Sequence, residues 1–263
     1  MTSKPTHDFF ADAMHVSVFA TPEELGTAAA ANTTAIVKDV LARNGSARVI
    51  FATGNSQFPF VEALHRHSDV DWSKVTAFHM DEYAGMSADH PASFRKWIRE
   101  RIEEVLHPAA VHYLEGDAPD LAEECRRYEA LLREAPIDLI CMGIGENGHI
   151  AFNDPPVADF NSPEWVKVLE LDHACRMQQV GEGHFTGLDD VPTHALSLTI
   201  PALIAPATVQ VVAPDARKAE AVKNTLQGPI SEACPASILR TQAQARLFLD
   251  QASFSLVDSH AFA

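Results

Sequence analysis

The sequence predicts an α/β protein with a Rossmann-like fold, in which a mostly parallel sheet is covered by helices on both faces. Short apolar stretches alternate along the chain with longer segments that have a helical period. Strands that alternate with helices form parallel sheets buried on both faces. Polar clusters also follow four of the predicted strands, which is typical of α/β proteins that bind ligands outside the carboxyl ends of their strands.

The first half of the chain supplies alternating helices and strands. A long helix begins with Thr21 as N-cap, Pro22 in the first turn and Glu24 completing a capping box. Gly45 ends this helix, and a strand at 48–52 follows it. The next predicted elements are an apolar-periodic helix around 60–64, a strand at 75–80, a helix at 91–106, a strand at 111–114 and a helix at 121–132.

The second half begins with a central strand at 137–142, which runs into a glycine-rich stretch at 143–155. Residues 172–194, rich in glycine and polar side chains, form either a mobile flap or a plain connector. The other predicted elements are strands at 166–171, 195–200, 208–213 and 246–249, a helix that ends at Gly228 and a short helical piece at 234–239. Because no internal repeat or linker is visible, we predict a single domain over residues 1–263.

Composition and charge restrict the partners and the location. The chain has 263 residues and a net charge of −16, so it would repel nucleic acid and anionic membranes. A local nest of N–H groups can still bind a small phosphorylated ligand. The four cysteines lie far apart, and neither a signal peptide nor a membrane span is recognisable, which predicts a cytoplasmic protein with reduced thiols. A homo-oligomer is possible.

The polar side chains of the glycine-rich stretch form the first candidate site. Histidine suits proton transfer near neutral pH, and Asn147 and Asp154 lie close enough in sequence to orient His149. The alternative is a loop histidine that only satisfies backbone carbonyls. The glycine spacing also matches a dinucleotide fingerprint, but Pro155 and Pro156 follow too soon for the helix that such a site opens. We therefore predict no nucleotide cofactor.

Polar residues after three other strands extend this candidate site. The turn before the second helix can bind an anion through its N–H groups, and its residues are Thr53, Gly54, Asn55 and Ser56. Asp81, beside Glu82, can act as a base for a carbon-bound proton when burial raises its pKa, although such a pair is often a solvated turn. Lys218 can hold a phosphate as a point charge.

We expect these clusters to lie at one edge of the sheet and to form a single pocket. A metal site is conceivable from the acidic and histidine side chains, namely Asp81, Glu82, His149 and Asp154. Their spacing matches no compact metal motif, so we predict no metal.

Two longer motifs resemble those of the glucosamine-6-phosphate deaminase (isomerase) family. They are Met80-Asp81-Glu82-Tyr83 with Gly85, and Gly143 to Pro155 in the form Gly-Ile-Gly-x-Asn-Gly-His-Ile-Ala-Phe-Asn-Asp-Pro. Thr53-Gly54 and Arg217-Lys218-Ala219 fit the same family in the same order, and the match covers residues 22–250. The resemblance implies a Rossmann-like fold. It also implies cofactor-free conversion of glucosamine 6-phosphate and water to fructose 6-phosphate and ammonia.

The resemblance further implies roles for the site residues. His149 would open the sugar ring, oriented by Asn147 and Asp154, and Asp81 would move a proton from C2 to C1. The residues expected to contact the sugar phosphate are Thr53, Gly54, Asn55, Ser56, Glu82, Gly148 and Lys218. Such an isomerisation needs a base, a group for the ring oxygens and an anchor, but neither metal nor nicotinamide.

The chain departs from the family pattern at several places. The family's flap usually carries an arginine before a phenylalanine, whereas this chain has His184 before Phe185, and Arg176 is the nearest arginine. The family often has glutamate where this chain has Asp154. Two further functions stay open: a related sugar-phosphate isomerase or 6-phosphogluconolactonase-like hydrolase, and a non-catalytic sugar-phosphate sensor. The stretch 150–153 differs from its lactonase counterpart.

Overall fold

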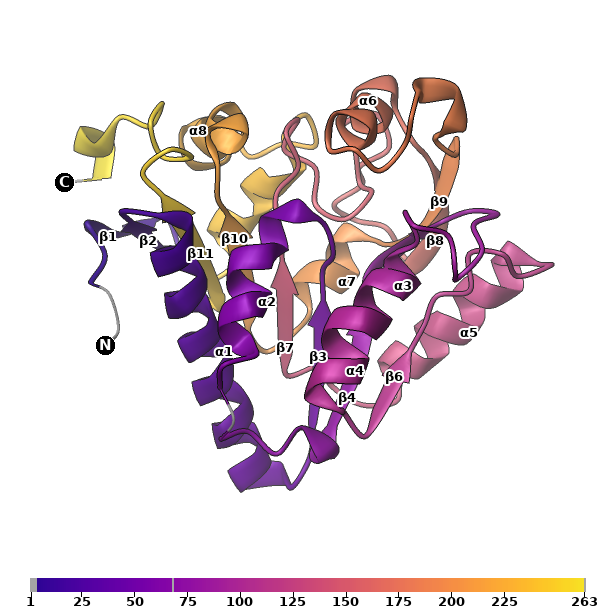
Figure 1. Ribbon diagram of the computed structural model, residues 1–263. Helices are drawn as coiled ribbons and strands as arrows, with labels where there is room; N and C mark the ends of the chain where they lie inside the picture. The colour runs from indigo at the N-terminus through magenta and orange to yellow at the C-terminus, as the bar shows by residue number, and fades with distance from the viewer. Residues whose placement is uncertain (1–3, 68, 263) are drawn as a thin grey trace.

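The computed structural model describes residues 4–67 and 69–262 and contains two sheets (Figure 1). The strands of the larger sheet are β1 (His7–Ala11), β2 (Met14–Phe19), β3 (Ala47–Phe51), β4 (Val75–His79), β6 (Ala110–His112), β7 (Leu139–Met142), β10 (Val209–Ala213) and β11 (Ala245–Asp250). Their order is β1-β2-β11-β10-β7-β3-β4-β6. All neighbours are parallel except β1 and β2, which form an antiparallel hairpin at one edge. The predicted mostly parallel sheet is confirmed.

Helices cover both faces of this sheet, as predicted. The helices of the structure are α1 (Pro22–Asn44), α2 (Phe58–Leu64), α3 (Phe94–Ile98), α4 (Glu104–Leu106), α5 (Leu121–Arg133), α6 (His173–Gly181), α7 (Ile200–Ile204) and α8 (Ala219–Gln227), of which α6 packs with the smaller sheet described below. Side chains of β3 alternate between the faces: Val49 and Phe51 pack in the core with α1 and α2, and Ile50 packs in the core with α5, α7 and α8. No helix in the described ranges is long and apolar enough to cross a membrane.

Helix α1 begins and ends where the sequence predicts. The Thr21 side chain accepts a hydrogen bond from the N–H of Glu24 at 3.2 Å, and Gly45 adopts the left-handed conformation at φ 77° just past the last turn. At Gly26 the backbones of α1 and α2 meet, because a Cβ there would lie 2.2 Å from the carbonyl oxygen of Pro59. The capping residues therefore set the length of α1, and Gly26 allows α2 to pack closely against it.

The smaller sheet was not predicted. Its strands are β5 (Asp81–Tyr83), β8 (Val166–Glu170) and β9 (His194–Leu198), in the antiparallel order β5-β9-β8. The strands predicted at 166–171 and 195–200 thus exist but stand outside the parallel sheet. Two neighbouring strands can be parallel only if the chain between them crosses over a face of the sheet. The segment between β8 and β9 makes no such crossover, so these two strands pair antiparallel.

Other elements differ from the prediction in detail. The hairpin of β1 and β2 was missed, as was α7, and the helix predicted at 91–106 begins after Ser93 and contains a π-helical turn at Arg99–Glu103. The segment 172–194 is not a plain connector: it contains α6 and a 3-10 turn at Leu188–Asp190. Asp172 caps α6 by accepting a hydrogen bond from the N–H of Cys175 at 2.7 Å.

The chain reverses its path through the larger sheet between β3 and β7. From β3 it continues to β4 and β6, and it then returns to β7 on the other side of β3 and proceeds to β10 and β11. In parallel α/β sheets, such a reversal opens a crevice at the carboxyl ends of the two central strands. Figure 1 shows α6 and α8 above the carboxyl end of β7. The polar turns after β3 and β7 therefore flank the crevice.

Candidate active site

A cavity opens at the carboxyl ends of β3, β4 and β7. It is lined by Ala52, Thr53, Gly54, Asn55, Ser56, Met80, Asp81, Phe94, Gly143, Ile144, Gly145, His149, Ala151, Phe152, Gln178, Gln179, Glu182 and Lys218. Each of the four polar clusters contributes at least one residue to this lining. Four of the predicted site residues are not in it: Glu82, Asn147, Gly148 and Asp154.

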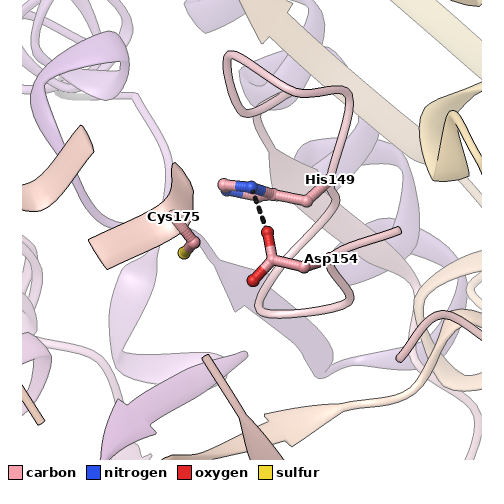
Figure 2. A group of neighbouring side chains, drawn as sticks. All are labelled: His149, Asp154 and Cys175. Atoms are coloured by element: carbon pink, nitrogen blue, oxygen red, sulfur yellow. Dashed lines mark ion pairs between the residues drawn. The ribbon is translucent and has the colours of Figure 1, made fainter. Parts of the chain in front are cut away.

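His149 is held beside a buried carboxylate (Figure 2). Its Nδ1 lies 2.9 Å from Asp154 Oδ1, at ion-pair distance, although the carboxylate stands off the direction of a straight N–H···O bond. Asn147 donates to the same oxygen at 3.0 Å and accepts from the N–H of His149 at 3.0 Å. Asp154 and Asn147 therefore act behind the histidine and not on the cavity side.

The carboxylate of Asp154 keeps its charge although it is fully buried. Burial raises the pKa of Asp154, but the adjacent imidazole of His149, with the amide of Asn147, outweighs burial and lowers the pKa below its ordinary value. An anion beside Nδ1 favours a proton on that nitrogen. Nε2 is then free to accept a proton from a ligand.

Two glycines shape the turn that carries His149. A Cβ on Gly145 would lie 2.2 Å from the Nε2 of the histidine ring, so any side chain there would displace the imidazole. Gly148 has φ 86°, in the left-handed region, and a Cβ there would lie 2.8 Å from Cys234 Sγ. Gly148 thus shapes the loop. It does not line the cavity, and its predicted contact with the ligand stays a prediction.

Asp81 stands where β4 passes into β5, and its side chain lines the cavity. Burial, with a smaller contribution from the charge of Glu82, raises the pKa of Asp81 to about 8. A carboxylate with a pKa near neutrality is a far stronger base than an exposed one. Asp81 is therefore suited to take a proton from carbon.

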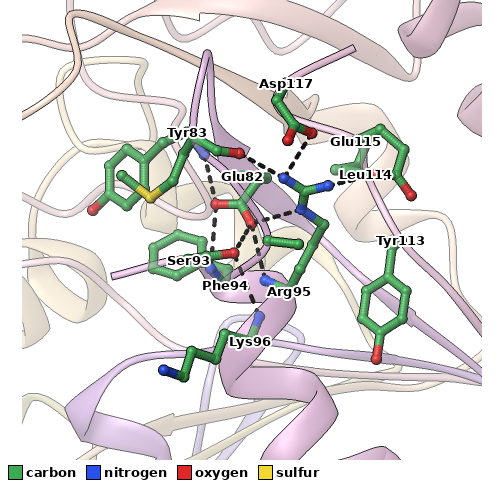
Figure 3. Close-up of polar contacts among 12 residues, drawn as sticks. Glu82, Tyr83, Ser93, Phe94, Arg95, Lys96, Tyr113, Leu114, Glu115 and Asp117 are labelled. Atoms are coloured by element: carbon green, nitrogen blue, oxygen red, sulfur yellow. Dashed lines mark hydrogen bonds and ion pairs between the residues drawn. The ribbon is translucent and has the colours of Figure 1, made fainter. Parts of the chain in front are cut away.

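Glu82 does not line the cavity, and its predicted contact with the ligand stays a prediction. Its carboxylate is fully buried and accepts hydrogen bonds from the N–H groups of residues 83, 94 and 95 and from the hydroxyl of Ser93 (Figure 3). The side chain of Arg95 also pairs with it, at 3.4 Å from Nε to Oε2. Glu82 therefore ties β5 to the start of α3.

Replacing Arg95 with methionine should destabilise the fold by about 3 kcal/mol, because it leaves a buried carboxylate without its cation. Arg95 is 4% exposed and also pairs with Asp117 and Glu115. Urea unfolding at pH 7 measures the change, and the double variant Arg95→Met/Glu82→Gln should lose less than the sum of the single variants. The matched control is Arg126→Met, whose exposed ion pair should matter little. Additive losses in the cycle would contradict the coupling.

Lys218 enters the cavity from the 3-10 turn Ala216–Lys218, which follows β10. It is 5% exposed, and burial lowers its pKa more than Glu182 and Glu146 raise it. The turn after β3 contains Gly54 at φ 94°, and its residues 53–56 line the same cavity. Over residues 4–67 and 69–262, Lys218 is the only lysine or arginine in the lining.

The flap contributes three residues that the sequence analysis missed: Gln178, Gln179 and Glu182. Glu182 accepts a hydrogen bond from Gln178 at 2.7 Å and pairs with His184 at 3.4 Å, so the histidine before Phe185 is turned to this acid. Arg176 lies elsewhere, because its guanidinium donates to the carbonyl groups of Leu188 and Val191. Neither side chain stands in the cavity as the family's flap arginine would.

The metal group considered from the sequence is not formed, because Glu82 is engaged with α3. Among the described residues, one group brings metal-binding atoms together: His149, Asp154 and Cys175.

The chain is similar to known proteins in both sequence and fold. The family model described as glucosamine-6-phosphate isomerases/6-phosphogluconolactonase matches residues 20–248. A glucosamine-6-phosphate deaminase of Bacillus thuringiensis (strain Al Hakam) is 36% identical over 243 residues, which cover 92% of this chain and 89% of that protein.

Solved structures show the same fold. That of a monomeric glucosamine-6-phosphate deaminase is 32% identical, with a TM-score of 0.84 over 92% of this chain and 99% of that one. The 6-phosphogluconolactonase from Shewanella baltica OS155 is 17% identical, with a TM-score of 0.73 over 89% of this chain and 96% of that one. The chain belongs to the glucosamine-6-phosphate isomerase/6-phosphogluconolactonase family, as the resemblance predicted.

Proposed function

We propose that this protein is a glucosamine-6-phosphate deaminase, which converts glucosamine 6-phosphate and water to fructose 6-phosphate and ammonia. One observation carries the proposal: a carboxyl group with a raised pKa, a histidine with an anionic partner and a buried lysine line one cavity. The relatives named as deaminases support it, at 36% and 32% identity over nearly the whole chain.

The proposed reaction begins with ring opening. Nε2 of His149 accepts the proton of the anomeric hydroxyl, and the imidazole then delivers a proton to the ring oxygen as the C1–O bond breaks. The negative charge of Asp154 stabilises the imidazolium that forms in between. The product of this step is the open-chain aldehyde.

Isomerisation follows at C1 and C2. Asp81 removes the proton from C2, and the C1 carbonyl oxygen takes up a proton that the amino group gives up, which leaves an enolamine. Asp81 then returns its proton to C1, so that C1 becomes a CH2OH group and C2 an imine. Water adds to this imine, and ammonia leaves as the C2 ketone of fructose 6-phosphate forms. The reaction needs one base, one acid–base group and one water, and no cofactor takes part.

The phosphate would lie between the turn at 53–56 and Lys218, so this lysine should act mainly on binding. Lys218→Met should raise KM for glucosamine 6-phosphate by about 10- to 100-fold, the value of one or two charge-assisted hydrogen bonds, with a smaller effect on kcat. Steady-state kinetics measure both constants. The control is Arg217→Met: Arg217 is half-exposed and pairs with Glu146 at 3.8 Å outside the lining. Equal KM values in the two variants would contradict this phosphate site.

The direct test is release of ammonia and fructose 6-phosphate from glucosamine 6-phosphate by the purified full chain. Absence of both products with folded protein refutes the deaminase proposal. Hydrolysis of a 6-phosphogluconolactone would then favour the lactonase alternative, which the fold shared at 17% identity also allows. Thermal stabilisation by sugar phosphates without any turnover would favour the sensor.

We propose that residues 1–263 act as one unit, because residues between 52 and 218 line a single cavity. The four cysteines are free, which supports a cytoplasmic location. The exclusion of nucleic acid and membrane partners rests on the net charge of −16, and a homo-oligomer remains possible.

A further inference from the structure

We propose that His149, Asp154 and Cys175 form a binding site for a thiophilic divalent cation, Zn²⁺ in particular, which inhibits the enzyme. One ligand atom from each residue lies within 4.8 Å of the other two, and all three residues are buried. Figure 2 shows the three side chains grouped between the turn after β7 and helix α6. The proposed deaminase reaction uses no metal, so this site would regulate the reaction and not serve it.

The donor set fits such an ion. An imidazole nitrogen, a carboxylate oxygen and a thiolate sulfur are the ligands that Zn²⁺ takes in proteins, and three protein ligands leave a fourth position open. His149 lines the cavity, so this fourth position can be filled from the cavity by water. Ions that prefer only oxygen, such as Mg²⁺, would gain little from the sulfur and nitrogen.

Two polar atoms of the group are buried without a well-formed hydrogen bond: His149 Nδ1 and Asp154 Oδ2. Asp154 is fully buried and His149 is 8% exposed. The polar neighbour of the carboxylate on the flap is the thiol of Cys175, which is only a weak donor. A buried N–H without an aligned acceptor and a buried carboxylate oxygen with only a weak donor both cost free energy, and a cation bound in place of the Nδ1 proton would remove that cost.

The charges balance when the ion is divalent. Burial, followed by the charge of Asp154, raises the pKa of the Cys175 thiol well above its ordinary value, but a coordinating metal displaces the thiol proton. One proton leaves to solvent, and the proton on Nδ1 of His149 moves to Nε2. The thiolate and the carboxylate then carry two negative charges against the two positive charges of the ion. A neutral cluster is the form that burial favours.

Inhibition follows from the histidine tautomer. With the metal on Nδ1, Nε2 carries the proton and cannot accept one from the anomeric hydroxyl. The ion would enter through the cavity, since His149 reaches solvent there. A bound sugar phosphate should therefore slow metal binding.

Cobalt(II) is the probe for the site, because a thiolate bound to Co²⁺ gives a charge-transfer absorption that imidazole and carboxylate ligands lack. The full chain without substrate should show this band at one Co²⁺ per chain, and Zn²⁺ should abolish it. Cys175→Ser should lose the band and bind Zn²⁺ at least about tenfold more weakly. Cys125→Ser is the matched control, since Cys125 is also a buried free cysteine but lies on α5. Cys175→Ala repeats the test if the serine variant fails to fold.

The inference is overturned if wild-type protein shows no charge-transfer band, or if Cys175→Ser retains it. In the activity assay, Zn²⁺ should inhibit ammonia release, a chelator should reverse the inhibition, and Cys175→Ser should resist it. Because one proton is released, the apparent affinity should rise about tenfold per pH unit. The cobalt band is measured without substrate, so metal binding can be demonstrated even if the protein does not release ammonia. Equally, the absence of the band would not affect the test of deaminase activity.

Discussion

Asp81→Asn should lower kcat for ammonia release by at least about 10³-fold while leaving the protein folded. A positioned acid–base group contributes about 10²- to 10⁴-fold, and Asp81 both removes the C2 proton and returns it to C1. NMR with substrate deuterated at C2 gives a direct measurement, because the wild-type protein should carry deuterium to C1 of fructose 6-phosphate and the variant should not. Asp89→Asn is the control, since the Asp89 side chain is 88% exposed and lies outside the cavity. Normal turnover by Asp81→Asn would exclude this residue as the base.

The raised pKa of Asp81 also predicts how activity and stability should depend on pH. With a pKa of about 8, roughly a tenth of the carboxyl groups are ionised at pH 7, so kcat/KM should rise nearly tenfold per pH unit below pH 8. The folded-state pKa lies above the unfolded value of 3.8, so this group stabilises the fold most at acidic pH. That contribution falls as pH rises from about 4 to 8. Asp81→Asn should remove this part of the pH dependence of unfolding, whatever reaction the protein catalyses.

Local signals explain which elements could be predicted. Both ends of α1 were readable because Thr21 and Gly45 act through their own backbone neighbourhood. The small antiparallel sheet was not, because β5 and β9 are separated by more than a hundred residues and no local pattern encodes their pairing. The positions of Asp81 and His149 followed from a simple rule, since side chains at the carboxyl ends of parallel strands meet at one edge.

Two features of the site follow from the residue period of its secondary-structure elements, namely the strand period in β5 and the helical period in α6. Alternate residues of a strand point to opposite faces, so once 81–83 forms β5, Asp81 and Glu82 cannot both face the cavity. On the flap, positions 175, 178, 179 and 182 have the spacing of one helical face, which is the face that meets the cavity and Asp154. That α6 packs over this cavity is a tertiary fact, and the sequence alone does not contain it.

Asp154→Asn should lower kcat by about 10³-fold, with little change in KM. A loss of this order is seen in hydrolases with a Ser-His-Asp triad when the aspartate beside the catalytic histidine is replaced by asparagine. The amide of asparagine can donate to Nδ1, which stabilises the Nε2–H tautomer and deprives His149 of its ability to accept a proton. Asp154→Glu is the matched control: it keeps the charge and adds one methylene, so it should retain activity within about tenfold despite some overpacking.

Steady-state kinetics of the two variants separate charge from packing. Asp154 is fully buried and its Oδ1 contacts both His149 and Asn147, so any substitution disturbs the turn to some degree. If the glutamate and asparagine variants lose activity equally, the carboxylate acts only as a packing element of the turn. If only asparagine fails, the negative charge that keeps a proton on Nδ1 is what makes His149 a base, and the loop after β7 owes its chemistry to Asp154.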